Sequence, residues 1–210
     1  MPNSIESLPV KSLNGVLSRQ EPAREPVDRY VYEPQDPVPT HGGEWRFFAP
    51  CGPLDQREIE GRKDVLVYTS EKLTEPLEVT GPVKVVLYAA SSATDTDWTA
   101  KLVDVHADGR AFNLCDGIIR ARYRQSLVKA ELLEPNKVYR YDIDLWATSN
   151  VFLPGHRLRV EVSSSNFPRF DRNPNAGHRF GVDAELRKAN QTVYHDQEYP
   201  SHILLPVIPK

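Results

Sequence analysis

Hydrophobic and polar residues alternate along Val138–Trp146, which reads VYRYDIDLW. Odd positions from 139 to 145 hold Tyr, Tyr, Ile and Leu, whereas even positions from 140 to 144 hold Arg, Asp and Asp. Side chains of a strand point alternately to its two faces, so this segment predicts a strand with one buried and one solvated face. Arg157–Ser163 repeats the pattern after the turn Leu153–His156, which reads LPGH. Two amphipathic strands around a Pro-Gly turn predict an antiparallel sandwich.

Short strand patterns separated by turn residues continue along most of the chain. Asp108-Gly109 predicts a hairpin turn, Gly81-Pro82 a turn and Asp116-Gly117 a bulge. Helix-forming residues occur in series only in Val182–Asn190. The pattern therefore predicts an all-β sandwich or barrel. The further predicted strands are Val65–Thr69, Leu77–Thr80, Val83–Ala89, Trp98–His106, Phe112–Leu114 with Gly117–Arg124, and Ile203–Ile208.

The first 27 residues differ from the rest of the chain. They are polar, contain four prolines and show no sustained period, so residues 1–27 are interpreted as an irregular arm or connector. Tyr30–Tyr32 fits a short edge strand, and residues 28–210 are predicted to form one sandwich domain. The predicted core comprises Val65, Val67, Val83, Val85, Leu87, Leu102, Ile118, Tyr141, Ile143, Leu145, Leu158, Val160, Val162 and Ile203.

Several segments carry a resemblance to a known family. The longest, residues 147–175, reads ATSNVFLPGHRLRVEVSSSNFPRFDRNPN. It resembles the signature of the C-terminal domain of the X-prolyl dipeptidyl-peptidase and cocaine-esterase (CocE/NonD) family of serine hydrolases. The resemblance runs from about Leu13 to the end of the chain. Further pieces that agree are GPLDQ at 52–56, DVLVYTSEKL at 64–73, residues 91–124 and PSHILLPVIP at 200–209.

The resemblance implies a fold and a role. In that family the domain is a jelly-roll β-sandwich, similar to galactose-binding domains, and packs beside an α/β-hydrolase core that holds the Ser-His-Asp triad. The chain is therefore expected to be a non-catalytic accessory domain that helps to shape a substrate pocket. Its expected partner is the hydrolase domain, in cis or as a separate chain. Ser12–Ser18 resembles the family's connector, whereas Met1–Lys11 departs from it.

Composition excludes several other classes. A net charge of −3 gives no broad basic field for nucleic acid. No run of 18 apolar residues spans a membrane, and no export signal precedes residue 15, so a cytoplasmic protein is expected. Cys51 and Cys115 are interpreted as buried free thiols. Zinc-site spacings and phosphate-binding loops are absent, so no cofactor or metal is predicted.

The sequence offers no catalytic residue. An α/β-hydrolase nucleophile requires Gly-x-Ser-x-Gly, and no serine has that setting. Ser163–Ser165 ends a strand and is assigned a structural role. His106 and His156 are interpreted as turn or edge residues rather than bases. Asp196 follows His195 and is able to orient its imidazole, but no serine elbow accompanies the pair.

Two acidic segments raise the question of Ca²⁺ binding. Asp95 and Asp97 flank Thr96, and Asp171–Asn175 reads DRNPN. Further metal-loop carboxylates are missing nearby, so hydrogen bonding of the loops is favoured in both segments. Asp95, Asp97 and Trp98 are nevertheless candidates for contact with the hydrolase part.

The loop after the strand at 157–163 carries an unusual set of side chains. Aromatic and Arg residues in loops are favoured anchors for protein contacts. An equally weighted interpretation is that the two phenylalanines close one end of the sandwich. The candidate interface or pocket-rim residues of this loop are Asn166, Phe167, Arg169, Phe170 and Asp171.

Two alternative functions remain open. The first is a carbohydrate- or ligand-binding module, with Trp45, Trp98 and Trp146 as candidate aromatic platforms; this rests on fold analogy. Trp146 is expected to be exposed or covered by a partner, because it lies on the opposite face from Tyr141. The second is self-association through a bare partner face, which gives a homo-oligomer.

Overall fold

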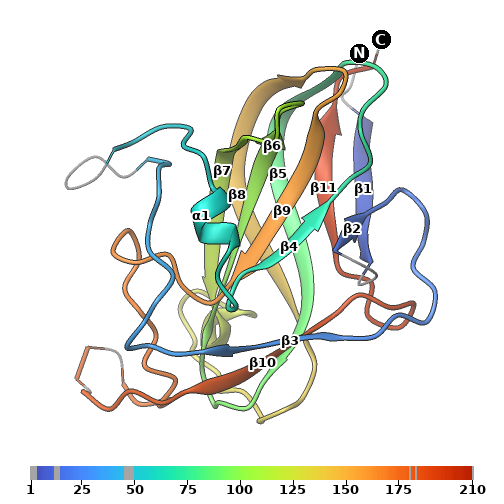
Figure 1. The fold of residues 1–210 in the computed structure, drawn as a ribbon. Helices are drawn as coiled ribbons and strands as arrows, with labels where there is room; N and C mark the ends of the chain where they lie inside the picture. Colours follow the sequence, from blue (N-terminus) through green and yellow to red (C-terminus); the bar gives the residue numbers. More distant parts are fainter. Residues whose placement is uncertain (1–3, 12–14, 45–49, 180, 183, 210) are drawn as a thin grey trace.

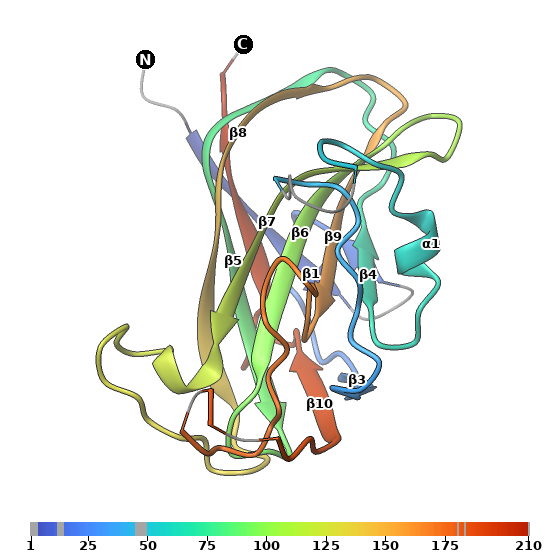
Figure 2. The same ribbon diagram turned by 90° about the vertical axis from the view of Figure 1, so that its left-hand side faces the viewer.

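The computed structural model describes residues 4–11, 15–44, 50–179, 181–182 and 184–209. Two layers of mainly antiparallel strands lie face to face, as seen most clearly in Figure 2. The all-β sandwich predicted from the alternating pattern is therefore confirmed. Within the described residues, no helix has the length and apolar character needed to cross a membrane.

The first layer is built around one long strand. Strand β5 (Leu77–Ser91) pairs with β8 (Tyr139–Phe152) on one edge, and with β11 (His202–Val207) and then β10 (Ala189–Tyr194) on the other. Strand β3 (Asp28–Tyr32) pairs with β10, and β1 (Ser4–Lys11) pairs with β11. Figure 1 shows β3 and β10 crossing below the other strands.

The second layer has the order β2, β4, β9, β6, β7. Strand β1 also pairs with β2, and so connects the two layers through backbone hydrogen bonds. The bounds are Val16–Leu17 for β2, Leu66–Thr69 for β4, Asp97–Val105 for β6, Ala111–Arg120 for β7 and Arg157–Ser163 for β9.

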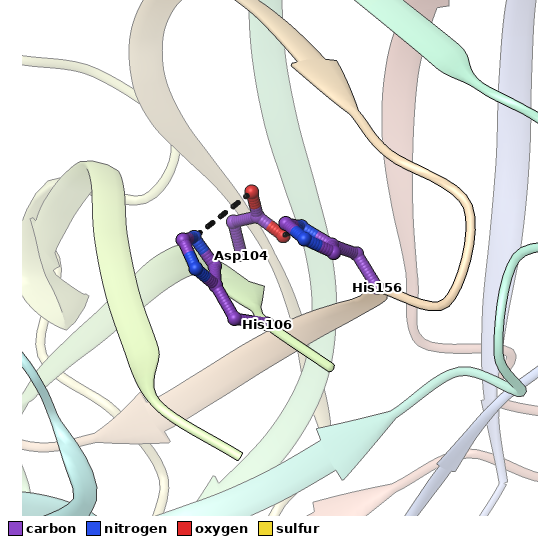
Figure 3. Close-up of side chains that lie close together, drawn as sticks. All are labelled: Asp104, His106 and His156. Carbon is purple, nitrogen blue, oxygen red and sulfur yellow. Dashed lines mark hydrogen bonds and ion pairs between the residues drawn. The ribbon is translucent and has the colours of Figure 1, made fainter. Parts of the chain in front are cut away.

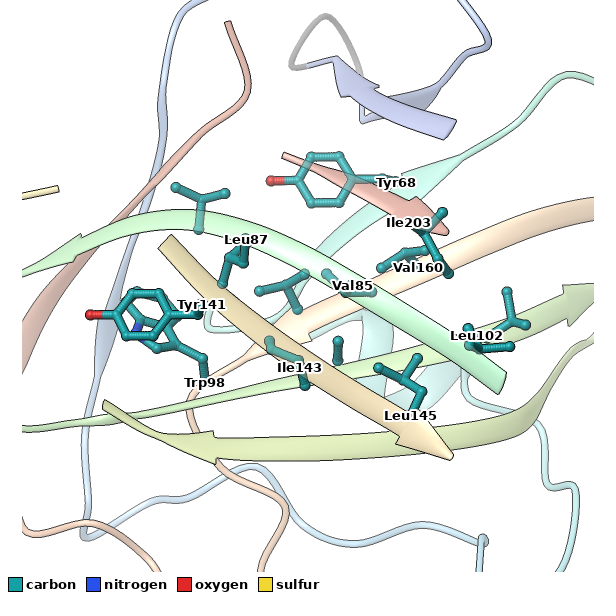
Figure 4. Packing of buried hydrophobic residues seen from close by; sticks show 14 of the residues in the cluster. Tyr68, Val85, Leu87, Trp98, Leu102, Tyr141, Ile143, Leu145, Val160 and Ile203 are labelled. Atoms are coloured by element: carbon teal, nitrogen blue, oxygen red, sulfur yellow. The ribbon is translucent and has the colours of Figure 1, made fainter. Parts of the chain in front are cut away.

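The inward faces of both layers form one continuous hydrophobic core (Figure 4). Trp98, the second residue of β6, belongs to this core and is fully buried, with its ring 5.8 Å from the ring of Tyr141 and 6.4 Å from that of Tyr30. The alternation in β8 places Tyr141, Ile143 and Leu145 in this core as predicted. The predicted core residues Val67 and Ile118 are only partly buried, and Val65 belongs to a second small cluster with Val38 and Ile59.

Strand β6 is buried on both of its faces. Its outer face is covered by the segment that carries the short helix α1 (Arg57–Glu60), visible on the outer side of the second layer in Figure 2. Lys101 on that outer face donates to Gln56 Oε1 at 2.9 Å and lies 3.4 Å from Glu161 of β9. A strand covered on both faces requires such pairing, because a lone buried charge is costly.

The open edges of the two layers meet where β7 approaches β8. A Cβ built at Gly117 of β7 would lie 1.9 Å from the backbone oxygen of Asp144 in β8. Only glycine allows this approach. The bulge predicted at Asp116-Gly117 is displaced, because the register of β7 against β6 shifts at Leu114.

Two further predictions differ from the structure. Ser4–Lys11 and Val16–Leu17 are strands, so the predicted irregular arm is limited to the stretch before β3. The two strands expected around Gly81-Pro82 are one strand, because β8 pairs with β5 on both sides of Gly81-Pro82, from Leu77 to Ala89. The series of helix-forming residues at 182–190 forms no helix among the described residues, and Ala189–Asn190 already belongs to β10.

Candidate functional site

Two buried aspartates begin the candidate site at one end of the sandwich. Asp97 is the first residue of β6, and Asp95 lies in the loop before it. Each is 1% exposed, and each carboxylate receives a charge-assisted bond from an arginine: Arg120 Nε to Asp97 at 2.9 Å, and Arg122 Nε to Asp95 at 2.8 Å. The amide of Asn173 donates to both, at 2.9 Å and 2.8 Å. The hydrogen-bonded loops favoured from the sequence are therefore confirmed.

Arg120 connects this buried pair to the surface. Its Nη2 donates to Asp97 at 3.1 Å and to both carboxylate oxygens of the exposed Asp171, also at 3.1 Å. Asn173 and Asp171 come from the long loop after β9, so the loop is fixed to the end of β6 through three side chains. A shallow cleft of about 310 Å³ lies beside this network. Its lining consists of Asp95, Arg120 and Arg122 together with residues of the loop after β9, namely Asp171, Arg172, Asn173, Pro174, His178, Arg179, Gly181, Ala184 and Leu186.

A second network fixes the start of the loop. Asn166 is 3% exposed and donates through Nδ2 to Asp116 of β7 at 2.8 Å. Arg169 forms a hydrogen-bonded ion pair with the same carboxylate. Arg169 therefore presents only part of its guanidinium to solvent, and its orientation is set by a buried acid.

The remaining predicted residues of the loop are at the surface. Phe167 is 40% exposed, Phe170 is partly buried with the Arg169 guanidinium 5.1 Å from its ring, and Asp171 is exposed. Asp95, Asp97 and Asn166 are buried and hold the loop in place through hydrogen bonds, whereas Trp98 is buried in the core. The structure therefore divides the predicted set into a supporting group and a smaller exposed group.

One exposed aromatic residue adjoins this loop. Trp146 is 69% exposed, as its position opposite Tyr141 predicted. It lies at a bulge of β8, where two residues, Leu145 and Trp146, oppose the single residue Val83 of β5. Its φ of 65° is unusual for a bulky residue, and its backbone N–H donates to Asp144 Oδ1 at 2.8 Å. Trp146 and Arg169 both line a cleft of about 230 Å³ that also contains Gly52, Leu114 and Asp116.

The other aromatic candidates do not form a sugar platform with it. Trp98 is completely buried in the core, and Trp45 lies outside the described residues. The exposed aromatic pair that a sugar site requires is therefore not formed by Trp98 and Trp146.

The serine triplet has the structural role that the sequence indicated. Ser163 Oγ lies 2.6 Å from Thr99 Oγ1, and Ser164 Oγ lies 2.8 Å from the hydroxyl of Tyr30. Ser165 Oγ accepts the backbone N–H of Val38 at 2.8 Å. All three are buried, so these hydroxyls bind neighbouring segments to the end of β9.

His195 is paired with a different acid from the one next to it in sequence. Its Nε2 lies 3.0 Å from Asp28 Oδ2, which also accepts from the hydroxyl of Tyr68 at 2.8 Å. Asp196 instead accepts from the backbone N–H groups of residues 198 and 199. The buried imidazole therefore joins β10 to β3 and β4.

The two cysteines are free thiols, as predicted. The predicted burial is wrong for Cys51, which is exposed, and Cys115 is partly buried. Burial and the nearby charge of Asp116 raise the pKa of Cys115 to about 12, which leaves almost no thiolate near neutral pH.

The acid beneath α1 gives a prediction for the dependence of stability on pH. Burial, opposed by Lys101 and reinforced by Glu60, raises the pKa of Glu161 to about 7 from 4.5. The folded state then binds more protons than the unfolded state between these values, so the free energy of unfolding falls as the pH rises from about 4.5 to 7. This fall in the free energy of unfolding amounts to at most about 3 kcal/mol, and we expect Glu161→Gln to remove it. Urea unfolding at several pH values measures the difference.

The matched control is Glu58→Gln, on the exposed side of the same helix. It is expected to keep the slope of the unmodified chain. Burial also raises the pKa of Asp97 to about 6, against the opposing effect of Arg120. Asp97 therefore contributes to the pH dependence of the free energy of unfolding, and it does so equally in both variants. Equal slopes for Glu161→Gln and the unmodified chain would contradict the prediction.

Comparison with known proteins assigns the domain. Residues 13–204 match the family described as the X-Pro dipeptidyl-peptidase C-terminal non-catalytic domain. The chain belongs to this family. The chain is 53% identical over 200 residues to the cocaine esterase of Rhodococcus sp. (strain MB1 Bresler). That alignment covers 92% of this chain and 34% of the esterase.

Solved structures give the same relationship. An aminopeptidase from a marine sediment archaeon of the Thaumarchaeota superposes with a TM-score of 0.89 at 36% identity, over 99% of this chain and 37% of the other. An α-amino acid ester hydrolase superposes with a TM-score of 0.87 at 34% identity, over 97% of this chain and 36% of the other. The domain therefore spans about a third of the relatives that it matches.

Sequence reasoning did not identify the basic partners of the candidate site. The sequence does contain a signal for Arg120 and Arg122, because both follow the apolar part of a predicted strand at alternate positions and so point to the same face. No sequence pattern indicates the contacts of Asn173 and Asp116, since these contacts join segments 50 or more residues apart.

Proposed function

We propose that this domain acts as the accessory part of an α/β-hydrolase-type serine hydrolase, docked in cis against the catalytic domain and helping to shape its substrate pocket. The family match over residues 13–204 carries the proposal. It is supported by relatives about three times as long that are named as an esterase, an aminopeptidase and an ester hydrolase. The chemistry is hydrolysis of an ester or amide by a serine nucleophile in the catalytic part.

The proposed docking surface consists of Trp146, Phe167, Arg169, Phe170 and Asp171. Trp146 and Phe167 expose large apolar areas, and Arg169 lies in the cleft beside Trp146. Exposed aromatic and Arg side chains that are held rigidly lose little entropy on binding and are enriched in interface centres. Asp95, Asp97, Trp98 and Asn166 act as positioning residues beneath this surface.

Replacement of the corresponding domain of the Rhodococcus cocaine esterase by this chain tests the proposal. We expect the chimera to hydrolyse an aryl ester and Phe167→Ser to lower kcat/KM about tenfold, the effect of losing one interface anchor worth about 1.4 kcal/mol. The pure domain alone is expected to give no turnover and no labelling by a fluorophosphonate.

The control variant is Leu127→Ser, which changes an apolar side chain that is 87% exposed in a loop outside the proposed surface. It is expected to leave the chimera unchanged. Full activity of the Phe167→Ser chimera would refute the docking surface, whereas labelling of a hydroxyl in the pure domain would refute the accessory role.

Three finer predictions from the sequence stay predictions. A galactose-binding-like character, a cytoplasmic location and a homo-oligomer are predictions of the sequence and resemblance. The family match does not favour the carbohydrate-binding alternative.

A further inference from the structure

Two histidines and one aspartate meet at the end of the sandwich opposite the candidate site. Asp104 is near the end of β6, His106 follows that strand and His156 immediately precedes β9. Nδ1 of His156 lies 2.9 Å from Asp104 Oδ1, and Nε2 of His106 lies 3.8 Å from Asp104 Oδ2. Figure 3 shows the carboxylate between the two imidazoles. One potential ligand atom of each residue lies within 4.8 Å of the other two.

We propose that Asp104, His106 and His156 bind a divalent transition-metal ion of the Zn²⁺ class. Neutral imidazole nitrogen and carboxylate oxygen are the ligands that such ions take in proteins, three of them commonly with a water in the fourth position. At metal–ligand bonds of about 2.1 Å, tetrahedral donors lie about 3.4 Å apart. His156 lies 2.9 Å from one carboxylate oxygen of Asp104, and His106 lies 3.8 Å from the other. One ligand atom from each residue lies within 4.8 Å of the others, so side-chain rotations that change these separations by about 1.4 Å or less bring the three atoms to tetrahedral spacing.

The backbone holds all three residues before any ion arrives. Asp104 is paired with Leu158 of β9 on one side and with Phe112 of β7 on the other. The N–H of His106 donates to the carbonyl of Arg110 at 2.8 Å, which closes the hairpin turn. The N–H of His156 donates to the carbonyl of Leu153 at 3.0 Å. Little conformational entropy is therefore lost when an ion binds.

The side chains around the cluster leave one face of it open. The rings of His106 and His156 are stacked with centroids 4.4 Å apart, and His106 also packs 4.8 Å from the ring of Phe112. Asp104 is 6% exposed, whereas the side chain of His106 is 33% exposed and gives solvent access.

The neighbouring cationic side chains are held by other partners. Arg110 donates through Nε to Asp108 at 2.8 Å, with its guanidinium 5.4 Å from the ring of Phe112. Arg157 donates to the carbonyl of Ser70 at 2.8 Å. In the part of the chain that the structure describes, neither arginine donates to Asp104, so the carboxylate is available to an ion.

Binding would connect two turns that are distant in sequence. The turn before β9 already touches the β6–β7 hairpin, since a Cβ at Gly155 would lie 3.6 Å from the Cβ of Ala107. An ion shared by His106 and His156 adds a cross-link at this contact and stabilises the folded state by mass action. Because His156 and Asn166 lie at opposite ends of β9, the proposed ion is remote from the docking surface.

Titration of the untagged, EDTA-treated domain with Zn²⁺ against a chromophoric indicator tests the proposal. We expect one ion per chain with a dissociation constant on the order of micromolar, since three ligands bind more weakly than a closed structural set. His106→Gln is expected to weaken binding at least about tenfold, as loss of one ligand should. Co²⁺ is expected to give visible d–d absorption in the unmodified chain and none in this variant.

His178→Gln is the matched control, because His178 is an exposed histidine of the loop at the other end of the sandwich. It is expected to bind Zn²⁺ as the unmodified chain does. His106 is partly exposed, so its replacement should leave a folded domain; circular dichroism confirms this before titration. Binding by the unmodified chain no tighter than by His106→Gln would overturn the metal site and leave the docking proposal untouched.

Discussion

Asp97→Ala is expected to lower the free energy of unfolding by about 3–5 kcal/mol, the usual cost of removing one partner of a buried ion pair. The carboxylate is 1% exposed and accepts bonds from Arg120 and Asn173. Without it, the guanidinium of Arg120 and the amide of Asn173 each lose one of their two carboxylate partners, and the loop after β9 loses its direct attachment to β6. Chemical unfolding followed by near-ultraviolet circular dichroism measures the change.

Asp171→Ala is the matched control, because it removes an exposed ion pair of the same arginine. Comparison of the two variants separates the effect of burial on the free energy of unfolding from the effect of losing an ion pair. Asp171 accepts from the same Arg120 nitrogen, but its side chain is 57% exposed. Exposed pairs contribute at most about 1 kcal/mol, so this variant should remain close to the unmodified chain. Equal stability of the two aspartate variants would contradict this prediction.

Gly117→Ala is expected to cost about 3 kcal/mol, at the upper end of the range for overpacking a closed interior. The new methyl group would lie 1.9 Å from the oxygen and 2.8 Å from the carbon of the Asp144 carbonyl. These are backbone atoms of a paired strand, so β7 and β8 must separate to admit the methyl group. Thermal unfolding of the two proteins measures the difference.

Gly61→Ala is the matched control for this substitution. Gly61 has a φ of −72°, and a Cβ there would lie 3.4 Å from the carbonyl oxygen of Glu58. An alanine fits both the backbone and the space, so the change should stay within about 0.5 kcal/mol. A cost for Gly117→Ala no greater than that of Gly61→Ala would show that the two strand edges are free to separate.

The strands with a solvated face were predictable because their period is local. Arg157–Ser163 was identified with its exact bounds, and Tyr141, Ile143 and Leu145 of β8 were correctly placed in the core. The prediction ended at Trp146 and so missed the continuation of β8 to the buried Phe152. Segments whose strand state depends on distant partners were missed. Ser4–Lys11 is a strand through its pairing with β11, almost two hundred residues later, and β10 through its pairing with β3 and β5.

The candidate site was predictable as a set of residues but not as an arrangement. Asp97 and Asp171 were both selected, yet their connection runs through Arg120, which is 23 residues from the first and 51 from the second. Trp98 was selected as a contact residue together with Asp95 and Asp97. The burial of β6 on both faces places it in the core instead, and only the folded chain reveals that cover.

The unequal environments of the two thiols make the domain easy to modify at one point. Cys51 is exposed next to Gly52, which lines the cleft that contains Trp146, whereas the raised pKa of Cys115 keeps it protonated. A maleimide dye should therefore attach to a single position without any engineered cysteine. That position adjoins the surface where a partner domain is proposed to bind, so the dye would report association directly by its change in emission.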